Sequence, residues 1–298
     1  MISGVSTRAI DLTLQRSMRL LQSQMIKAQK ETQTGVMSEL DLGLAEQVQR
    51  PLSLWRDVDR LDAILHTNKS VATVLNGTQT ALESVRESAR ALSSSMVAAA
   101  GGGTALAAAE QSSRSALASM VSVLNTQIAG QYPFSGINSD VPPFEQTGGI
   151  PGGAEMDAVF LAHFGFAKDT LAASSVSATD FDGFLQTQIA PVFFGNAWKA
   201  TISSAADIGI RAKISLTETV TVSISANDGA IRSAVFAAAA SANFLGSNVS
   251  TAAKNALIKK SFELTANAQA GIAALSTGIL LSTLLAVVSE SLLLALFI

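Results

Sequence analysis

The two histidines of the chain, His66 and His163, are the side chains best suited to acid–base catalysis or metal binding. His66 falls on the polar side of a strongly patterned helical segment, where a histidine usually faces solvent and binds nothing. His163 lies in an apolar run with Phe160 and Phe164, where packing is the simpler interpretation. Neither histidine therefore predicts a catalytic or metal-binding site.

Carboxylates offer a second route to metal binding. Asp57, Asp59 and Asp62 share one helical segment, and their spacing spreads them around its axis so that they cannot converge on one ion. Asp180 and Asp182 could bind a cation, although such a pair more often faces solvent. Zinc-protease, phosphate-loop, nucleophile-elbow and EF-hand patterns are all missing, and the lack of cysteine excludes thiolate chemistry. We expect no catalytic residue, no cofactor and no metal, and infer that the chain is not an enzyme.

Composition also limits the kinds of partner. The formal net charge is -3, which provides no basic face for nucleic acid. Charged residues make up 14% of the chain, whereas about 25% is typical of soluble domains. Alanine and serine take their place, and such small side chains let helices pack closely. We therefore expect neither nucleic acid nor a small-molecule substrate as a partner.

Residues 5–40 predict an amphipathic helix. Steps of four and three connect Ile10, Leu14, Met18, Leu21 and Met25, which is the spacing of a coiled-coil seam. The opposite face has few paired charges, so most of the helix stability must come from burying this seam against another helix. We predict these five residues as a subunit interface.

A second seam runs through a long helix that we expect to begin near Leu52, after a connector that contains Pro51. Asn68 lies in this seam and would fix its register. Gly101–Gly103 predicts a turn into an antiparallel helix, and Asn227 or Asp228 can cap a further helical region. The predicted bundle seam consists of Leu54, Val58, Leu61, Leu65, Leu75, Leu82, Leu92, Leu117, Leu124, Leu257 and Leu264.

The helical pattern stops after residue 130. Four of the six prolines lie in residues 131–153, which rules out a continuous helix there. Farther along, WKATIS (198–203) and TETVTVSISA (217–226) alternate β-branched and polar residues and predict strands. We expect a mainly α fold, with a long-helix coiled-coil bundle formed by the N- and C-terminal regions and an inserted central β-containing domain.

These boundaries define five segments. Residues 1–43 form an N-terminal assembly helix, 44–136 and 227–277 the two parts of a helical bundle, and 137–226 an inserted α/β or β domain. Residues 278–298 form an atypical hydrophobic tail whose single charge is Glu290. Because the sequence character changes abruptly near Gly278, we expect a frameshift or truncated reading there, with a real membrane segment as the alternative.

The segment AGQYPFSGINSD (129–140) resembles the signature that ends the N-terminal helical region in bacterial flagellin relatives. Gly130, Tyr132, Phe134, Ser135 and Gly136 match its G-x-Y-x-F-S-G pattern. The resemblance covers about residues 1–277 and is greatest to the hook-associated proteins of the hook–filament junction, of alphaproteobacterial type. After residue 277 the chain departs from the family, which continues there with a Gln-rich amphipathic helix.

The resemblance implies a structural, extracellular role in the flagellum, at the junction between hook and filament. Such proteins are exported without a cleavable signal peptide, and the N-terminus here has no signal-peptide pattern. Implied partners are copies of the same chain in a ring, another hook-associated protein, flagellin and an export chaperone. Two alternatives stay open: a flagellin filament subunit, and a secreted membrane-inserting effector that uses the hydrophobic tail.

Overall fold

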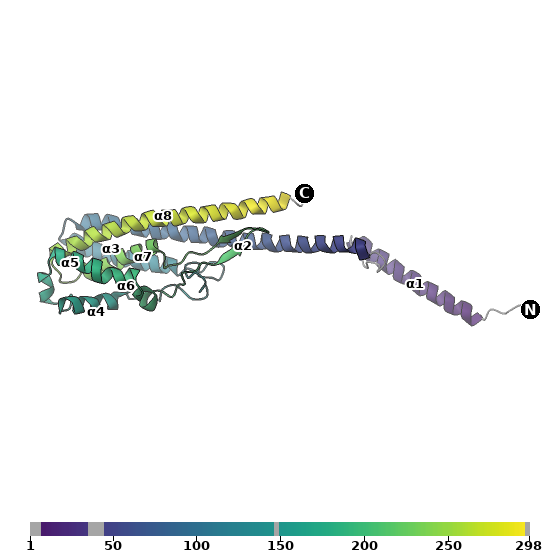
Figure 1. Ribbon diagram of the computed structural model, residues 1–298, viewed down its shortest axis with the longest axis horizontal. Coiled ribbons are helices and arrows are strands. Elements are labelled where there is room, and N and C mark those ends of the chain that lie inside the picture. The colour runs from purple at the N-terminus through teal and green to yellow at the C-terminus, as the bar shows by residue number, and fades with distance from the viewer. Residues whose placement is uncertain (1–6, 35–44, 146–148, 296–298) are drawn as a thin grey trace, which may run out of the picture. The chain divides into compact units, whose positions relative to one another are not determined.

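The computed structural model of the chain describes residues 7–34, 45–145 and 149–295. They belong to two compact units, Met1–Leu61 and Asp62–Ile298. Long helices make up most of both units, and the described residues contain only a two-stranded sheet, so the prediction of a mainly α fold is confirmed (Figure 1). The five segment boundaries stay predictions.

The first unit holds helix α1 (Thr7–Thr34) and the start of helix α2 (Ala45–Ala99). Helix α2 begins earlier than Leu52, so the prediction that Pro51 closes a connector is wrong. Proline has a fixed φ of about -65°, which is itself a helical value, so α2 continues through Pro51, although the ring removes one backbone hydrogen bond and crowds the carbonyl four residues before it. Within this unit α1 is a regular helix, and nearly all of its described side chains are exposed.

An antiparallel hairpin of α2 and α3 (Thr104–Leu124) forms one side of the second unit. The turn falls at Gly101–Gly103, as the sequence predicts. One contact joins the two helices, since the Ser88 hydroxyl of α2 lies 3.3 Å from that of Ser119 of α3. Just after α3, the Ile128 side chain packs on α2 so closely that a Cβ at Gly77 would come within 2.7 Å of it. The small residues therefore let the two helices pack closely.

Helix α7 (Gly229–Phe244) is the centre of the second unit, and nearly all of its residues are buried. Helices α3 and α8 (Thr251–Ala295) pack against it (Figure 1). A helix that is apolar all round is a core helix, and its run of alanines lets its neighbours approach. A Cβ at Gly271 of α8 would lie 2.5 Å from the Ala230 Cβ, so this crossing of α7 and α8 requires glycine.

The segment between α3 and α7 combines short helical elements, one small sheet and long irregular stretches. It contains α4 (Gly153–Phe164), a 3₁₀ turn η2 (Leu171–Ser175), α5 (Ala178–Phe184), π-helical turns η3 (Leu185–Ile189) and η4 (Trp198–Ile202), and α6 (Ala190–Phe194). Strands β1 (Arg211–Lys213) and β2 (Thr219–Thr221) pair antiparallel, with Ala212 opposite Val220. The predicted strand in 217–226 is thus confirmed over Thr219–Thr221.

The strand predicted for WKATIS is wrong, because this stretch forms η4. Trp198 is fully buried; its indole N–H donates to Asn227 Oδ1 at 2.7 Å, and its ring packs edge-on against Phe144. Burial of this one large ring outweighs the local preference of β-branched residues for strands.

Helix α8 continues through residue 278 without a break. Its buried side continues past that point with Ile279, Ala286 and Ser289. Near the C-terminal end, Asn68 of α2 donates from Nδ2 to Ser289 Oγ and to the Ile214 carbonyl, both at 3.0 Å. The apolar sequence after residue 278 therefore packs against α2 in one register, and Asn68 takes part in fixing it.

Candidate assembly surfaces

The exposed stripe of α1 is the first candidate surface. Leu14, Met18, Leu21 and Met25 are 62%, 61%, 63% and 76% exposed, and their spacing places them on one face of the helix. The side chain of Ile10, the fifth residue of the predicted interface, lies outside the described residues. Exposing four large apolar side chains in one stripe is unfavourable, since full burial of each is worth about 1.5–3 kcal/mol. This face, here called the α1 stripe (Leu14, Met18, Leu21 and Met25), is therefore suited to packing against another apolar surface.

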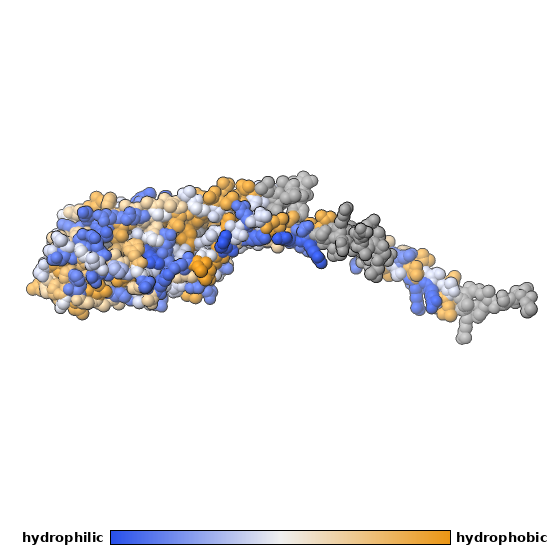
Figure 2. Space-filling view, viewed as in Figure 1, coloured by the Kyte–Doolittle hydropathy of each residue, from blue (hydrophilic) through white to orange (hydrophobic). Residues whose placement is uncertain are grey.

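A second apolar face lies near the end of α8, opposite the side that packs on α2. Leu280, Leu281, Leu284, Val287 and Val288 are between 44% and 59% exposed. Orange residues gather there in the space-filling view (Figure 2). The composition of this stretch predicts a hydrophobic tail, whereas in the structure these residues form one face of a helix. The spacing of 280, 284 and 287 carries the signal, because these positions follow helical steps of four and three.

The predicted bundle seam divides into buried and less buried parts. Leu54 is exposed, and Val58, Leu61 and Leu65 are half-buried. Between residues 62 and 75 the side chains that α2 buries are Ile64, Asn68 and Val71. Asn68 is buried as the seam predicts, whereas Ile64 is buried in place of the predicted Leu65, one position along the helix. The remaining seam residues are buried in the core of the second unit: Leu75, Leu82, Leu92, Leu117, Leu124, Leu257 and Leu264.

The aromatic motif joins the end of α3 to the segment that leads into α7. Phe134 and Ser135 are fully buried, and Tyr132 is half-buried. The Ser135 hydroxyl donates to the Val141 carbonyl at 2.5 Å, and its main chain forms a bridge with Ser225. The motif therefore closes a loop against the residues just before the α7 N-cap.

Gly136 is the most constrained residue of the motif. Its φ is +63°, and a Cβ there would lie 2.5 Å from the Ala206 carbonyl oxygen and 2.6 Å from that of Ile208. Gly130 also has a positive φ, +79°, but nothing would come within 4 Å of its Cβ. Both positions favour glycine for conformation, and only Gly136 also needs it for space.

The candidate chemical residues do not form a site. His66 and His163 are exposed, and the His163 ring packs edge-on to Phe164 at 4.6 Å between centroids. Asp180 receives a 2.7 Å hydrogen bond from Ser177, while Asp182 receives one of 2.8 Å from Gln186. Within the described ranges no group of three or more His, Cys, Asp and Glu side chains could hold a metal ion.

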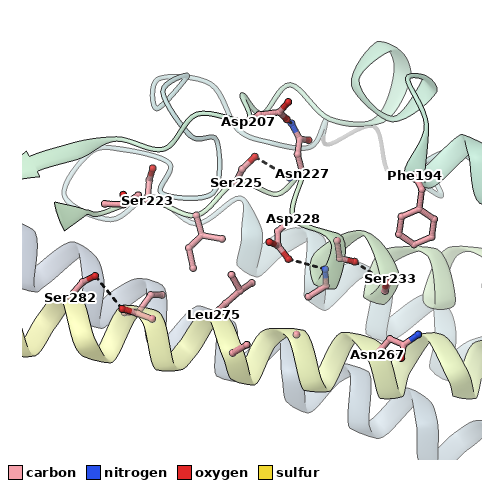
Figure 3. Close-up of a pocket in the computed structure, with 18 residues that line it drawn as sticks. Phe194, Asp207, Ser223, Ser225, Asn227, Asp228, Ser233, Asn267, Leu275 and Ser282 are labelled. Atoms are coloured by element: carbon pink, nitrogen blue, oxygen red, sulfur yellow. Dashed lines mark hydrogen bonds between the residues drawn. The ribbon is translucent and has the colours of Figure 1, made fainter. Parts of the chain in front are cut away.

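A groove of about 1030 Å³ lies between α8 and the N-terminal end of α7 (Figure 3). Gly271, Ala274 and Gly278 line its α8 side, and the small size of these residues opens the gap. On the other side Asp228 Oδ1 accepts the Ala230 N–H at 2.8 Å, so the predicted cap of α7 is confirmed. The groove is a product of small-residue packing.

Two polar side chains at this groove, Asn227 and Asp207, are hydrogen-bonded to each other and to neighbouring groups. Asn227 Nδ2 donates to Asp207 Oδ1 at 2.8 Å and to the Ala205 carbonyl at 2.7 Å. Lys199 donates to the second carboxylate oxygen of Asp207. Hydrogen bonds from Lys199 and then Asn227 lower the pKa of Asp207 below its usual 3.8. Asp207 therefore acts as a hydrogen-bond acceptor in its charged form and is poorly suited to act as a general base.

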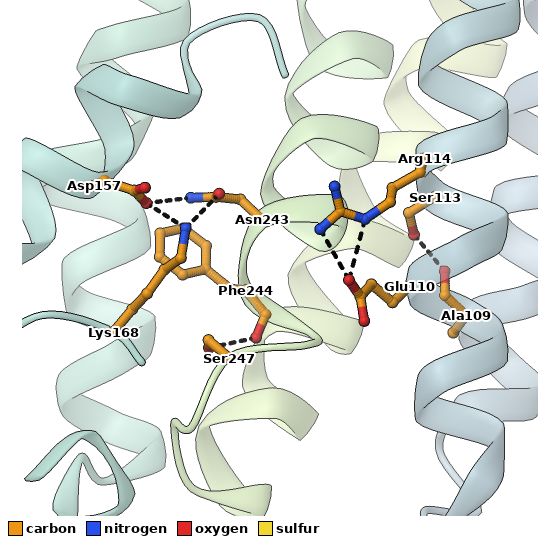
Figure 4. A network of polar contacts seen from close by, with 9 residues as sticks. All are labelled: Ala109, Glu110, Ser113, Arg114, Asp157, Lys168, Asn243, Phe244 and Ser247. Carbon is orange, nitrogen blue, oxygen red and sulfur yellow. Dashed lines mark hydrogen bonds and ion pairs between the residues drawn. The ribbon is translucent and has the colours of Figure 1, made fainter. Parts of the chain in front are cut away.

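A polar network connects α4, Lys168 and the C-terminal end of α7 (Figure 4). Lys168 donates to Asp157 of α4 at 2.6 Å and to Asn243 Oδ1 of α7 at 2.7 Å. Asn243 Nδ2 also donates to Asp157 at 2.8 Å, and the Lys168 ammonium lies 5.9 Å from the Phe244 ring centroid. These contacts hold α4 against α7. They also explain why Lys168 is largely buried, because its ammonium group is paired with a carboxylate and an amide oxygen.

Comparison with known families gives one match. Residues 5–139 match the bacterial flagellin N-terminal helical region. No match was found among curated proteins or among solved structures. The matched range contains α1, α2, α3 and the aromatic motif. The match covers less than half of the chain, and it shows that this N-terminal part is similar to the helical region of bacterial flagellins.

Proposed function

We propose that this chain, whose residues 5–139 carry the flagellin-type N-terminal helical region, is a structural protein of the junction between the flagellar hook and filament. In this role it acts by helix packing, as a ring of copies between another hook-associated protein and flagellin. An export chaperone and a route without a cleaved signal peptide belong to the same proposal.

The observation that carries the proposal is the α1 stripe within the matched range. Its four described residues are all more than 60% exposed in the single chain. Such an exposed face is expected of a subunit that buries it only on assembly, because the apolar area then leaves water. The second apolar face, on α8, offers a further surface for helix packing.

A charge placed in the α1 stripe tests the proposal. Leu21→Asp would put a carboxylate into a buried interface, so we expect the purified subunit to lose attachment to hook ends while it stays folded. Ser23→Asp is the matched control, because Ser23 is exposed on the opposite side of the same helix. Electron microscopy of hook ends with added subunit gives the readout. Equal attachment of both variants would contradict a role of the stripe in assembly.

A flagellin filament subunit is the neighbouring alternative, and self-assembly distinguishes the two. A junction protein is expected to cap hook ends without extending them, whereas a filament subunit extends into long polymers at high concentration. Extension by the purified chain alone would overturn the junction role and leave the flagellar role intact.

A membrane-inserting effector is favoured by one separate observation. Helix α8 over Thr251–Ser289 is the only described helix that is long and apolar enough to cross a membrane, by length and composition alone. Much of its buried side packs in the core of the chain, with Leu257 and Ile272 fully buried, so insertion would require this core to open. Flotation with liposomes of the full chain, compared with a chain that ends at Thr277, tests this alternative. Flotation of the full chain alone would support it.

A further inference from the structure

The methionines fall into two groups of opposite exposure. Met96, Met120 and Met156 are 0% exposed in the core of the second unit. Met18 and Met25 of α1 are 61% and 76% exposed. The chain has seven methionines, and the remaining two lie outside the described residues. A reagent in solution can therefore reach the thioethers of Met18 and Met25, while it cannot reach those of the core.

Both exposed methionines lie on the α1 stripe. Met18 follows Leu14 by one helical step, and Met25 follows Leu21 by the same step, so the four side chains share one face. A thioether suits such a face because it is apolar and polarisable. Met18 and Met25, the two residues accessible to oxidation, thus make up half of the α1 stripe that assembly would bury.

We propose that Met18 and Met25 form an oxidation-sensitive modification site through which a hydroperoxide stops the free subunit from assembling. The inference rests on the proposed function, since it takes the α1 stripe as the assembly contact. The co-reactant is hydrogen peroxide or an organic hydroperoxide.

The reaction is a two-electron oxygen transfer. The thioether sulfur attacks one peroxide oxygen, an S–O bond forms and the O–O bond breaks. A proton moves to the departing oxygen, which leaves as water or an alcohol. Sulfur is oxidised to the sulfoxide, and the peroxide is reduced.

The sulfoxide changes the stripe from apolar to polar. Its oxygen is a strong hydrogen-bond acceptor that is solvated in the free subunit and loses water when the face is buried. We expect the subunit concentration needed for assembly to rise by about tenfold or more. The fold should survive, because the core thioethers are shielded. Subunits that have already assembled should resist oxidation, since the contact covers both sulfur atoms.

Peroxide treatment of the full chain, read by peptide mass spectrometry and by sedimentation of assemblies, tests the inference. In the free subunit we expect oxygen addition at Met18 and Met25 before Met96, Met120 or Met156, with an unchanged circular dichroism spectrum. The Met18→Leu/Met25→Leu variant should assemble and should keep that ability after peroxide. This variant retains the two methionines outside the described residues, so it separates their effect from that of the stripe.

Two results would overturn the inference. One is oxidation of the core methionines as early as Met18 and Met25. The other is loss of assembly in the oxidised Met18→Leu/Met25→Leu variant to the same degree as in the oxidised native chain. Failure of the untreated native chain to assemble would instead count against the proposed function, and with it against the assembly consequence of oxidation.

Discussion

Replacing Gly136 by alanine should destabilise the second unit far more than the same change at Gly130. Both glycines have positive φ, +63° and +79°, where a Cβ costs about 1–2 kcal/mol. At Gly136 the new Cβ would also lie within 2.6 Å of the Ala206 and Ile208 carbonyl oxygens, so the chain there must move.

That movement threatens two main-chain hydrogen bonds. Ile137 N donates to the Ile208 carbonyl at 2.9 Å, and Ala206 N donates to the Ser135 carbonyl at 3.0 Å. Each is worth about 1 kcal/mol net. The expected loss in unfolding free energy is therefore about 3–4 kcal/mol for Gly136→Ala, against about 1–2 kcal/mol for Gly130→Ala.

Urea unfolding followed by the fluorescence of Trp198 measures both losses. Trp198 is fully buried in this unit, while Trp55, the second tryptophan, is 56% exposed. A Trp55→Phe background leaves Trp198 as the single reporter. Equal destabilisation by the two alanine variants would refute the reasoning, because it would mean that the close approach at Gly136 costs nothing.

Three further substitutions test the contacts that set register, capping and charge. Ser289→Ala removes a hydroxyl bonded to Asn68 at 3.0 Å and should lower the unfolding free energy by about 1 kcal/mol, measured by urea denaturation. Asp228→Ala removes the α7 N-cap and should cost about 1 kcal/mol by the same assay. Asp207→Asn should make the melting temperature depend less on pH. The pKa of Asp207 is lowered in the folded state. Its contribution to stability is therefore present above the unfolded-state pKa and is lost as the pH falls through the folded-state pKa.

Each of these predictions has its own control. Ser291→Ala changes an exposed hydroxyl on the same helix and should leave stability unchanged. The control for Asp228→Ala is Asp169→Ala, which removes an exposed carboxylate that caps no helix and should leave the unfolding free energy unchanged. If the melting temperatures of the native chain and of the Asp207→Asn variant fell equally in acid, other carboxylates would be responsible for the pH dependence.

The sequence by itself determined the helical architecture of the ends. Periodicity of four and three predicted the long helices, because one apolar face repeats every few residues whatever the partner is. It did not predict that α2 begins before Leu52 or that α8 continues past residue 278. Glycine and aspartate marked the turn at Gly101–Gly103 and the cap at Asp228, since these are local conformational preferences. The same periodicity predicted the α1 stripe, whereas the aromatic motif was found by its resemblance to the signature of flagellin relatives.

Only the tertiary structure decided what depends on distant partners. Trp198 forms a helical turn because Phe144 and Asn227 enclose its ring, and no local pattern contains that information. The need for glycine at Gly136 comes from carbonyl groups that follow it by many residues. By composition alone, the stretch after residue 278 differs from the rest of the chain. In the structure it packs against α2 and continues helix α8, with one buried and one exposed apolar face. Hydropathy counts apolar residues, but only the contacts of a helix decide which of them face water.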